Sequence, residues 1–558
     1  MSTIALARLL VGCFVVCGGG AGETVVVEVD SGRLRGTVEV SVGGRTYYAF
    51  RGVPYAQPPI GPRRFQPPER VEAWEGVRNV TEHPPICIQT GVFPRPPGVY
   101  GNEDCLYLNV FTPSIQGQDM PVMFWVHGGG FNIASPQSQG PDYLMDRDVV
   151  LVTIQYRLGI FGFLSTEDEA CPGNYGMLDQ VEALKWVARN IRAFGGHPDK
   201  VTLFGNSAGG ASVHLLMLSP LTQGLFRSGI SQSGTSLGHW VLQGPGKARE
   251  RADLVASLVG CPTDSTLNLL ECLRGTDAFT LTQATASFWV WSLSPIRFSP
   301  RVDAESREPF LPRSPQMILE SGDFHRVPWM TGITREEGLW LALEAVIDES
   351  LWRHLDENWR SKYCPAILGL EDDPEACDEI RFKYLKDLPI DRDSISDINR
   401  LLGDRWFGVP AQQALKLHSR WTETYAYSFE YEGEKNIIDF WLAEFLQNGG
   451  LKPHGACHTD ETLYMFKNPV LPPIVDGSDF LVRTRVMDLW LNFTHHGKPQ
   501  LKPPAKNEHR WLPWTEADDR HYVIELYPRL GRNLVPMEIL QSWEGLESKR
   551  PRVLDMAG

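Results

Sequence analysis

The sequence predicts an α/β fold in which a central, mostly parallel β-sheet is flanked by helices and carries helical insertions. One observation is a series of continuous apolar runs, which is typical of parallel strands buried on both faces. Another is a helical pattern between two of these runs, because strand, helix and strand in succession favour a right-handed parallel crossover. A third is the mostly helical, charged stretch over residues 339–420, which predicts an inserted side layer.

Three apolar runs in the first half of the chain predict strands. They are residues 121–129 (PVMFWVHGG), 148–159 (DVVLVTIQYRLG) and 200–206 (KVTLFGN). Between the second and third runs, residues 174–199 repeat apolar side chains at helical spacing, and Gly195 with the next glycine supplies a stop. Further strand candidates follow at residues 226–234, 327–333, 425–431 and 521–526.

The composition is that of an ordinary globular chain. Of its 558 residues, 42% are hydrophobic and 22% are charged. The 53 basic and 68 acidic side chains leave a formal net charge of −15, which argues against nucleic acid or an anionic membrane as a partner. No internal repeat or low-complexity linker divides the chain, so we expect one domain over residues 23–545 and a short tail over 546–558.

The amino terminus predicts a secretory signal peptide over residues 1–22. Its apolar core, Ile4–Cys17, is too short to span a bilayer, and the small residues that follow suit a peptidase that cuts after Gly22. The basic region is thin, so a membrane anchor is the alternative. The tail carries neither a hydrophobic anchor signal nor a retrieval tetrapeptide, and we expect a secreted, extracellular protein without stable membrane insertion.

Ten cysteines suit an oxidising compartment. Two of them, Cys13 and Cys17, lie in the predicted signal peptide. The spacing of the others leaves their pairing open, although three neighbouring pairs would each close a short loop that contributes roughly 3 kcal/mol in the chain-entropy description. These pairs are Cys87 with Cys105, Cys261 with Cys272, and Cys364 with Cys377, and Cys171 and Cys457 stay unassigned.

Two sequons permit N-glycosylation, at Asn79 (NVT) and Asn492 (NFT). The second lies in a helix-like pattern, MDLWLNFTHHG, which makes it the less favourable acceptor. We therefore expect a glycoprotein, with Asn79 as the better site.

A serine between two glycines carries the first chemical signal. The stretch LFGNSAGGASV places Ser207 directly after a strand-like run and before a helix-like one. Gly205 and Gly209 let strand and helix approach closely, which is the nucleophile-elbow pattern, and the helix amino terminus favours negative charge. Because this short pattern also arises by chance, a plain turn is the alternative.

A triple glycine upstream supports the chemical interpretation. VHGGGF, residues 126–131, follows a strand and would let bare backbone N–H groups approach a carbonyl oxygen. We expect the N–H groups of Gly129, Gly130 and Ala208 to form an oxyanion hole. The alternative is an ordinary glycine turn.

Longer motifs carry a family resemblance. They are YAFRGVPYAQPPIGPRRFQPP (residues 48–68), EDCLYLNVFTP (103–113) and GNYGMLDQVEALKWV (173–187). With them, the chain resembles the type-B carboxylesterase/cholinesterase family of α/β-hydrolases, which includes juvenile hormone esterases, over about residues 23–528. The resemblance implies the α/β-hydrolase fold and a carboxylesterase-type domain.

The resemblance also implies the partners of the serine. The family's acid matches Glu337 in TREEGLW, while Glu336 fits a solvated turn. The family's histidine matches His458 in HTDETLYMF, with His454 as a nearby decoy. Serine, acid and histidine then follow in the chain order expected of this fold.

Supporting residues follow from the same resemblance. Ser233 matches a serine that supports the acid–histidine pair, and Asn206 stands where cholinesterases carry glutamate and juvenile hormone esterases typically carry glutamine. The amide removes negative potential near the histidine. The family's ion pairs match Arg64 with Glu103 and Arg157 with Asp179, and its short disulfides match Cys87–Cys105 and Cys261–Cys272; Cys364–Cys377 has no such support.

The loop between Cys87 and Cys105 narrows the substrate. It contains no tryptophan, whereas cholinesterases hold the ammonium group of choline over a tryptophan of this loop. Phe93 or Tyr100 would substitute weakly, so we expect poor turnover of choline esters.

Together these features predict a secreted serine hydrolase that cleaves carboxylic esters through an acyl-enzyme, without a metal or organic cofactor. Its partner is a small-molecule ester, and organophosphates and carbamates are expected to modify Ser207. One alternative is an esterase dedicated to a sesquiterpenoid methyl ester, of the juvenile hormone or methyl farnesoate type. The other is a non-catalytic binding, adhesion or sequestering protein.

Overall fold

The computed structural model describes residues 23–549 except 92–96, 118, 372, 387, 443–445, 447–453 and 502–509. The predicted signal peptide with Cys13 and Cys17, most of the predicted tail, and Phe93 lie outside the described residues. Among the helices that the structure describes, none is both long enough and apolar enough to cross a bilayer.

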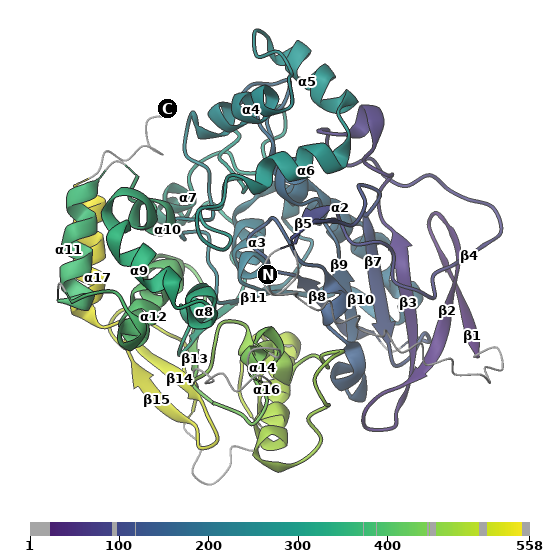
Figure 1. Ribbon diagram of the computed structural model, residues 1–558. Helices are drawn as coiled ribbons and strands as arrows, with labels where there is room; N and C mark the ends of the chain where they lie inside the picture. Colours follow the sequence, from purple (N-terminus) through teal and green to yellow (C-terminus); the bar gives the residue numbers. More distant parts are fainter. Residues whose placement is uncertain are drawn as a thin grey trace, which may run out of the picture.

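A sheet of 13 strands forms the centre of the described chain (Figure 1). Its order is β1-β2-β3-β7-β9-β8-β10-β11-β12-β13-β14-β15, with β4 paired to β2. Neighbours from β9 to β14 are parallel, whereas the main-path pairs outside that range are antiparallel. The strands are β1 (Thr24–Val29), β2 (Gly32–Val40), β3 (Thr46–Pro54), β4 (Val77–Asn79), β7 (Tyr107–Thr112), β8 (Met120–Val126), β9 (Val150–Ile154), β10 (Gly196–Asn206), β11 (Ser228–Gln232), β12 (Trp329–Thr334), β13 (Thr424–Phe429), β14 (Arg520–Ile524) and β15 (Arg529–Arg532), and a separate hairpin joins β5 (Gln89–Thr90) to β6 (Val99–Tyr100).

Helices pack on both faces of this sheet. α3 packs against β10 and β11, and α16 packs against β8 and β10. The helices are α1 (Gly159–Phe163), α2 (Tyr175–Asn190), α3 (Ala208–Leu218), α4 (Lys247–Leu258), α5 (Thr266–Gly275), α6 (Ala278–Ala286), α7 (Pro315–Ser321), α8 (Leu339–Ile347), α9 (Ser350–Glu357), α10 (Cys364–Leu368), α11 (Pro374–Leu385), α12 (Ile395–Gly403), α13 (Val409–His418), α14 (Ile437–Trp441), α16 (Gly477–His496) and α17 (Met537–Ser548).

Alternate residues of the central strands belong to two separate hydrophobic cores. In β8, Val122, Phe124 and Val126 join the core that includes α2 and α3, whereas Met123 and Trp125 join the core that includes α16. Successive side chains of a strand point to opposite faces, and this sheet is covered on both. The continuous apolar runs of the sequence have this physical cause.

The predicted fold class is confirmed. The three early runs overlap β8, β9 and β10, and the later candidates overlap β11 to β14, although β10 begins four residues before its predicted run. The predicted helix is α2. The helical segment, including a short 3-10 turn that follows α2, ends at Gly195, which has a φ of 75°. The sequence did not predict strands β1 to β4, whose residues are mostly part-exposed and therefore lack a continuous apolar run.

The predicted side layer is also confirmed. Residues 339–420 form α8 to α13, of which α8 to α12 lie together at one side of the sheet (Figure 1). Two π-helical segments interrupt this layer, Trp359–Tyr363 and Asp404–Gly408. A disulfide between Cys364 and Cys377 joins α10 to α11, a pairing that spacing allowed but the resemblance did not support.

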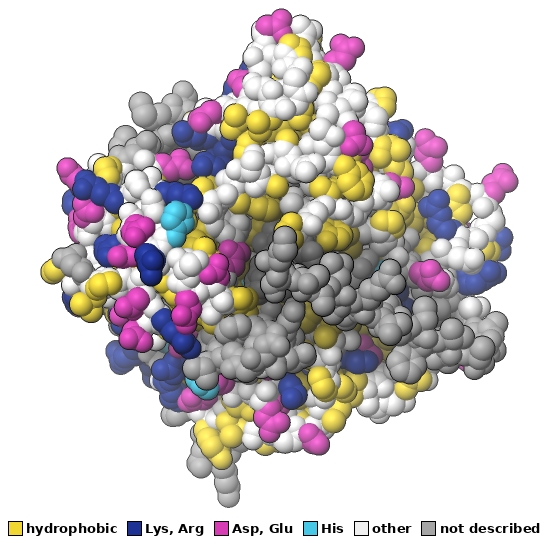
Figure 2. Space-filling view, viewed as in Figure 1, with side chains coloured by type: hydrophobic (Ala, Val, Ile, Leu, Met, Phe, Trp, Pro, Cys, Tyr) yellow, Lys and Arg dark blue, Asp and Glu magenta, His cyan; other side chains and the backbone are white. Residues whose placement is uncertain are grey.

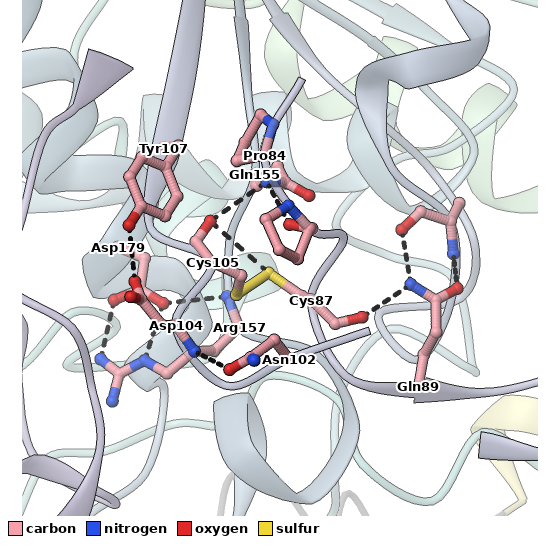
Figure 3. Close-up of a disulfide and its surroundings, with 12 residues drawn as sticks. Pro84, Cys87, Gln89, Asn102, Asp104, Cys105, Tyr107, Gln155, Arg157 and Asp179 are labelled. Carbon is pink, nitrogen blue, oxygen red and sulfur yellow. Dashed lines mark hydrogen bonds and ion pairs between the residues drawn. A yellow bond between two sulfur atoms is a disulfide. The ribbon is translucent and has the colours of Figure 1, made fainter. Parts of the chain in front are cut away.

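The other predicted cross-links are present in the structure. Disulfides join Cys87 to Cys105 and Cys261 to Cys272. Figure 3 shows the first of them beside the Arg157–Asp179 ion pair. Both expected ion pairs form, Arg64–Glu103 at 2.6 Å and Arg157–Asp179 at 2.7 Å. Cys171 and Cys457 are buried and unpaired.

The two sequons differ in their surroundings. Asn79 is exposed at the end of β4. Asn492 is half-buried in α16, and the Thr494 that completes its sequon is wholly buried. A glycosyltransferase needs an accessible, extended acceptor, so this geometry favours Asn79.

Candidate active site

Ser207 lies in the turn between β10 and α3, with a φ of 61° and a ψ of −124°. L-residues rarely adopt such a conformation, and it persists because the surroundings hold it. A Cβ on Gly205 would lie 2.6 Å from the Gly209 backbone, and one on Gly209 would lie 2.0 Å from the Val126 carbonyl oxygen. Both glycines are therefore required by the close approach of strand and helix, which is the reason the sequence pattern suggested.

The structure brings Glu337 and His458 together. His458 Nδ1 lies 2.5 Å from Glu337 Oε2, and both residues are 3% exposed. The Thr334 N–H donates to Glu337 Oε1 at 2.8 Å, so both carboxylate oxygens are engaged. This contact assigns the proton of the imidazole to Nδ1 and leaves Nε2 as the acceptor.

Glu336 and His454, the neighbouring candidates for the acid and the histidine, have other partners. The Glu336 carboxylate accepts a hydrogen bond from the Asn399 amide. The His454 side chain is 85% exposed and pairs with Glu432 at 3.1 Å. The motif positions that the resemblance selected, rather than their neighbours, are thus the ones that meet.

Ser207 and His458 line one cavity of about 610 Å³. Between described residues, no hydrogen bond joins the Ser207 hydroxyl to the imidazole. Hydrogen bonds of this kind are often loose in the free state and tighten when a substrate binds. The imidazole is stacked with Phe407 at 4.4 Å and with Trp340 at 5.6 Å between ring centroids, which limits its rotation.

The three candidate oxyanion donors lie near the serine, because Gly129 and Gly130 line the same cavity as Ser207 and Ala208 follows Ser207 in the chain. Gly129 and Gly130 have φ values of 98° and 58°, and a Cβ on Gly129 would lie 2.2 Å from the Ile133 carbonyl oxygen. Ala208 is the first residue of α3, where backbone N–H groups lack intrahelical acceptors. No described residue accepts from the N–H of Gly129, Gly130 or Ala208. These groups are therefore candidate donors for an oxyanion.

A carboxyl group that sequence reasoning missed lies behind the serine. Glu461 Oε1 accepts from the side-chain amides of Asn206 and Gln232, each at 3.2 Å. Burial raises the pKa of the Glu461 carboxyl to about 8, and the charge of Glu337 adds to the shift. A carboxyl group therefore lies beside Asn206, but with a pKa of about 8 it is mostly protonated near neutral pH and does not restore the negative potential that the amide removes. The only signal was the glutamate within HTDETLYMF, the motif used for His458.

Ser233 makes no hydrogen bond to the pair that it was expected to support, among the residues that the structure describes. It is fully buried, and its Oγ has no hydrogen-bond partner in the described part of the chain. Its backbone N–H donates to the Gly332 carbonyl oxygen at 2.9 Å. No hydrogen bond of its hydroxyl therefore supports the role in holding the acid–histidine pair that the resemblance implies.

The described cavity walls combine aromatic and aliphatic side chains with neutral polar ones. The described lining residues include no Asp, Glu, Lys or Arg, and the described chain contains no cluster of side chains suited to a metal ion. Tyr100, expected as a weak substitute for the missing tryptophan, is not a lining residue. Aromatic rings come instead from other elements, namely Trp125, Trp340, Phe440, Trp441 and Phe466.

Comparisons with known proteins agree with this geometry. Residues 23–540 match the family described as the carboxylesterase family. The chain is 35% identical over 488 residues to venom carboxylesterase-6 of Apis mellifera, covering 85% of this chain and 86% of the relative. It is 36% identical to a carboxylic ester hydrolase of Bombus ignitus (87% and 89% covered) and to juvenile hormone esterase of Tribolium castaneum (88% and 86%). The chain therefore belongs to the carboxylesterase family, has its α/β-hydrolase fold and is a carboxylic ester hydrolase.

Proposed function

We propose that the protein is a secreted serine hydrolase that cleaves uncharged carboxylic esters through an acyl-enzyme on Ser207. The observation that carries the proposal is the 2.5 Å contact between Glu337 and His458 beside the cavity that Ser207 lines. A serine hydroxyl is a poor nucleophile unless a base takes its proton and a third group orients that base. The three residues supply these functions.

The reaction proceeds in two halves. Ser207 Oγ attacks the ester carbonyl carbon while His458 Nε2 takes the hydroxyl proton, and Glu337 stabilises the imidazolium that forms. The N–H groups of Gly129, Gly130 and Ala208 bind the oxyanion. The tetrahedral intermediate expels the alcohol, which receives the proton from His458. Water then attacks the acyl-enzyme with the same base, releases the acid and restores the hydroxyl.

The cavity supports an uncharged substrate. A quaternary ammonium group entering it would leave water without meeting a carboxylate among the described lining residues, and only the faces of aromatic rings would offset that loss. An alkyl or terpenoid ester would instead bury apolar surface against the aromatic walls, at about 25 cal/mol per Å². The relative named juvenile hormone esterase makes a sesquiterpenoid methyl ester the second substrate to test.

An ester panel on the purified protein tests the proposal. Nitrophenyl esters of short and long acids, a choline ester and a methyl terpenoid ester are compared by kcat/KM. Ser207→Ala should lower turnover at least about 10,000-fold, and Ser257→Ala, at an exposed serine of α4, should not change it. Residual activity of Ser207→Ala near wild type contradicts the mechanism, and preference for choline contradicts the substrate class.

Covalent labelling distinguishes catalysis from binding alone. An organophosphate or carbamate should add its acyl or phosphoryl group to Ser207, as located by peptide mass spectrometry. Sustained multiple turnovers exclude a sequestering protein that is acylated once. An adhesion role without chemistry predicts neither result.

Secretion is part of the same proposal. The predicted signal peptide and the three disulfides of the structure support an oxidising destination. Expression of the full chain in eukaryotic cells should yield protein in the medium that begins at Glu23. Retention of the intact amino terminus in the membrane fraction would instead support an anchor.

A further inference from the structure

The loop closed by Cys87–Cys105 contacts the proposed oxyanion-hole turn through one side chain. Gln89 lies on β5, two residues after Cys87, and is 2% exposed. Figure 3 shows it beside the disulfide, with its carboxamide bonded away from the sulfur atoms. Its carboxamide bonds to the backbone of Ala134, the last residue of the turn that begins at Gly129.

The carboxamide forms a reciprocal pair with the Ala134 backbone. The Ala134 N–H donates to Gln89 Oε1 at 2.7 Å, and Gln89 Nε2 donates to the Ala134 carbonyl oxygen at 3.0 Å. The same Nε2 donates to the Cys87 carbonyl oxygen at 2.9 Å. Both amide hydrogens are thereby used, and only this orientation of the amide satisfies all three partners. No other natural side chain of this length presents a donor pair and an acceptor on one plane.

The pair holds a backbone conformation that is otherwise unfavourable. Ala134 has a φ of 81°, in the left-handed region that L-residues rarely adopt. Its turn is tight, since the Ile133 N–H donates to the Gly129 carbonyl oxygen at 3.0 Å. A Cβ on Gly129 would lie 2.9 Å from the Ala134 Cβ. A shift of Ala134 would therefore move Gly129 and the N–H that it offers to the oxyanion.

The Gln89 end of this connection is anchored in the sheet. The Ile88 N–H donates to the Asn102 carbonyl oxygen at 3.0 Å. Gln155, which follows β9, donates from Nε2 to the carbonyl oxygens of Pro85 at 3.1 Å and Cys105 at 3.3 Å. The disulfide closes the same loop. These hydrogen bonds and the disulfide hold the backbone on both sides of Gln89 and thereby fix the position of its amide relative to the turn.

We propose that Gln89 is a positioning residue that holds the Gly129–Ala134 turn, and thus the oxyanion hole, in register with Ser207. The inference rests on the proposed function, because it assigns Gly129 as an oxyanion donor. An oxyanion hole acts on the transition state rather than on the bound ester. Loss of the amide should therefore lower kcat and leave KM nearly unchanged.

The test is Gln89→Leu, which keeps the size of the side chain and removes all three hydrogen bonds. We expect kcat for a nitrophenyl ester to fall about 10- to 100-fold per active site titrated with organophosphate, with KM within about threefold. The affinity for a trifluoromethyl ketone, whose hemiketal on Ser207 carries an oxyanion, should fall by the same factor as kcat/KM. The pH profile should keep its midpoint, because the variant leaves the Glu337–His458 contact intact.

Gln137→Leu is the matched control. Gln137 is an exposed glutamine of the same segment, and its side chain donates to the Pro84 carbonyl oxygen at 2.8 Å without touching the turn. Its kcat should stay within twofold of wild type. Should Gln89→Leu be recovered unfolded, Gln89→Glu replaces it, since it keeps the length and the acceptor for the Ala134 N–H but loses both donors.

The outcomes separate this inference from the proposed function. A wild type without turnover, or an active Ser207→Ala, overturns the proposed function. The positioning role alone is overturned if the wild type is active, Ser207→Ala is inactive, and a folded Gln89 variant has a kcat within twofold of wild type. A loss confined to KM, or a displaced pH midpoint, also contradicts it.

Discussion

Glu461→Gln should stabilise the protein at alkaline pH and have little effect at acidic pH. The pKa of this carboxyl is raised from 4.5 to about 8, first by burial and then by the charge of Glu337. In the unfolded chain the carboxyl ionises at its ordinary pKa, so between these values the folded state binds more protons. The free energy of unfolding of the wild type therefore falls as pH rises from about 4.5 to about 8.

The magnitude follows from the width of that window. Each pKa unit corresponds to about 1.4 kcal/mol, so the loss between pH 5 and pH 9 amounts to up to about 4 kcal/mol. A glutamine at position 461 keeps an oxygen that accepts from Asn206 and Gln232 but cannot ionise. The variant should therefore lack this part of the pH dependence.

Urea unfolding followed by tryptophan fluorescence at pH 5, 7 and 9 measures the effect. The stability difference between Glu461→Gln and wild type should grow with pH and level off above about pH 8. Glu75→Gln, at an exposed glutamate, is the control and should show no such trend. A difference that is constant or shrinks with rising pH would refute a raised pKa at Glu461.

Three further outcomes are expected. Gly209→Ala should abolish soluble expression or cost at least about 3 kcal/mol of stability, because its Cβ would lie 2.0 Å from the Val126 carbonyl oxygen; circular dichroism and melting temperature measure this. Burial lowers the pKa of His214 to about 3 and that of His418 well below 6.5, so both stay neutral when folded. Stability should fall by about 1.4 kcal/mol per histidine for each pH unit below 6.5, and His418→Phe should flatten that slope in denaturation at pH 5 to 7. Asn79→Gln should remove most of the glycan mass of secreted protein, as glycosidase digestion and gel mobility will report; an unchanged mass would point to Asn492.

The fold was predictable because its determinants act between near neighbours in the chain. β8 and the second half of β10 are covered on both faces, and their sequences are nearly all apolar for that reason. The turn at Ser207 needs glycine two residues away on each side, and the clashes that a Cβ would make at Gly205 and Gly209 explain why. Strands β1 and β2 at the antiparallel edge of the sheet were not predicted, because they mix exposed and buried residues and contain no continuous apolar run.

The candidate site was predictable only where a motif carried each residue. Glu337 and His458 are 121 residues apart, and their contact at 2.5 Å followed from family motifs rather than from periodicity. Glu461 lay inside the same motif as His458, yet its burial against Asn206 could not be deduced from spacing. Phe407, which stacks with the imidazole at 4.4 Å, had no sequence signal at all.

By itself, the sequence determined the order of the elements and the two tight turns that present Ser207 and Gly129, since local sterics and side-chain alternation govern both. The tertiary structure alone decided which polar groups meet. Gln89 bonds to Ala134, the Glu461 carboxyl accepts from Asn206, and the Ser233 hydroxyl makes no hydrogen bond to the acid–histidine pair. A hydrogen bond forms or fails within a fraction of an ångström, and that precision depends on how distant elements pack rather than on any segment of the chain.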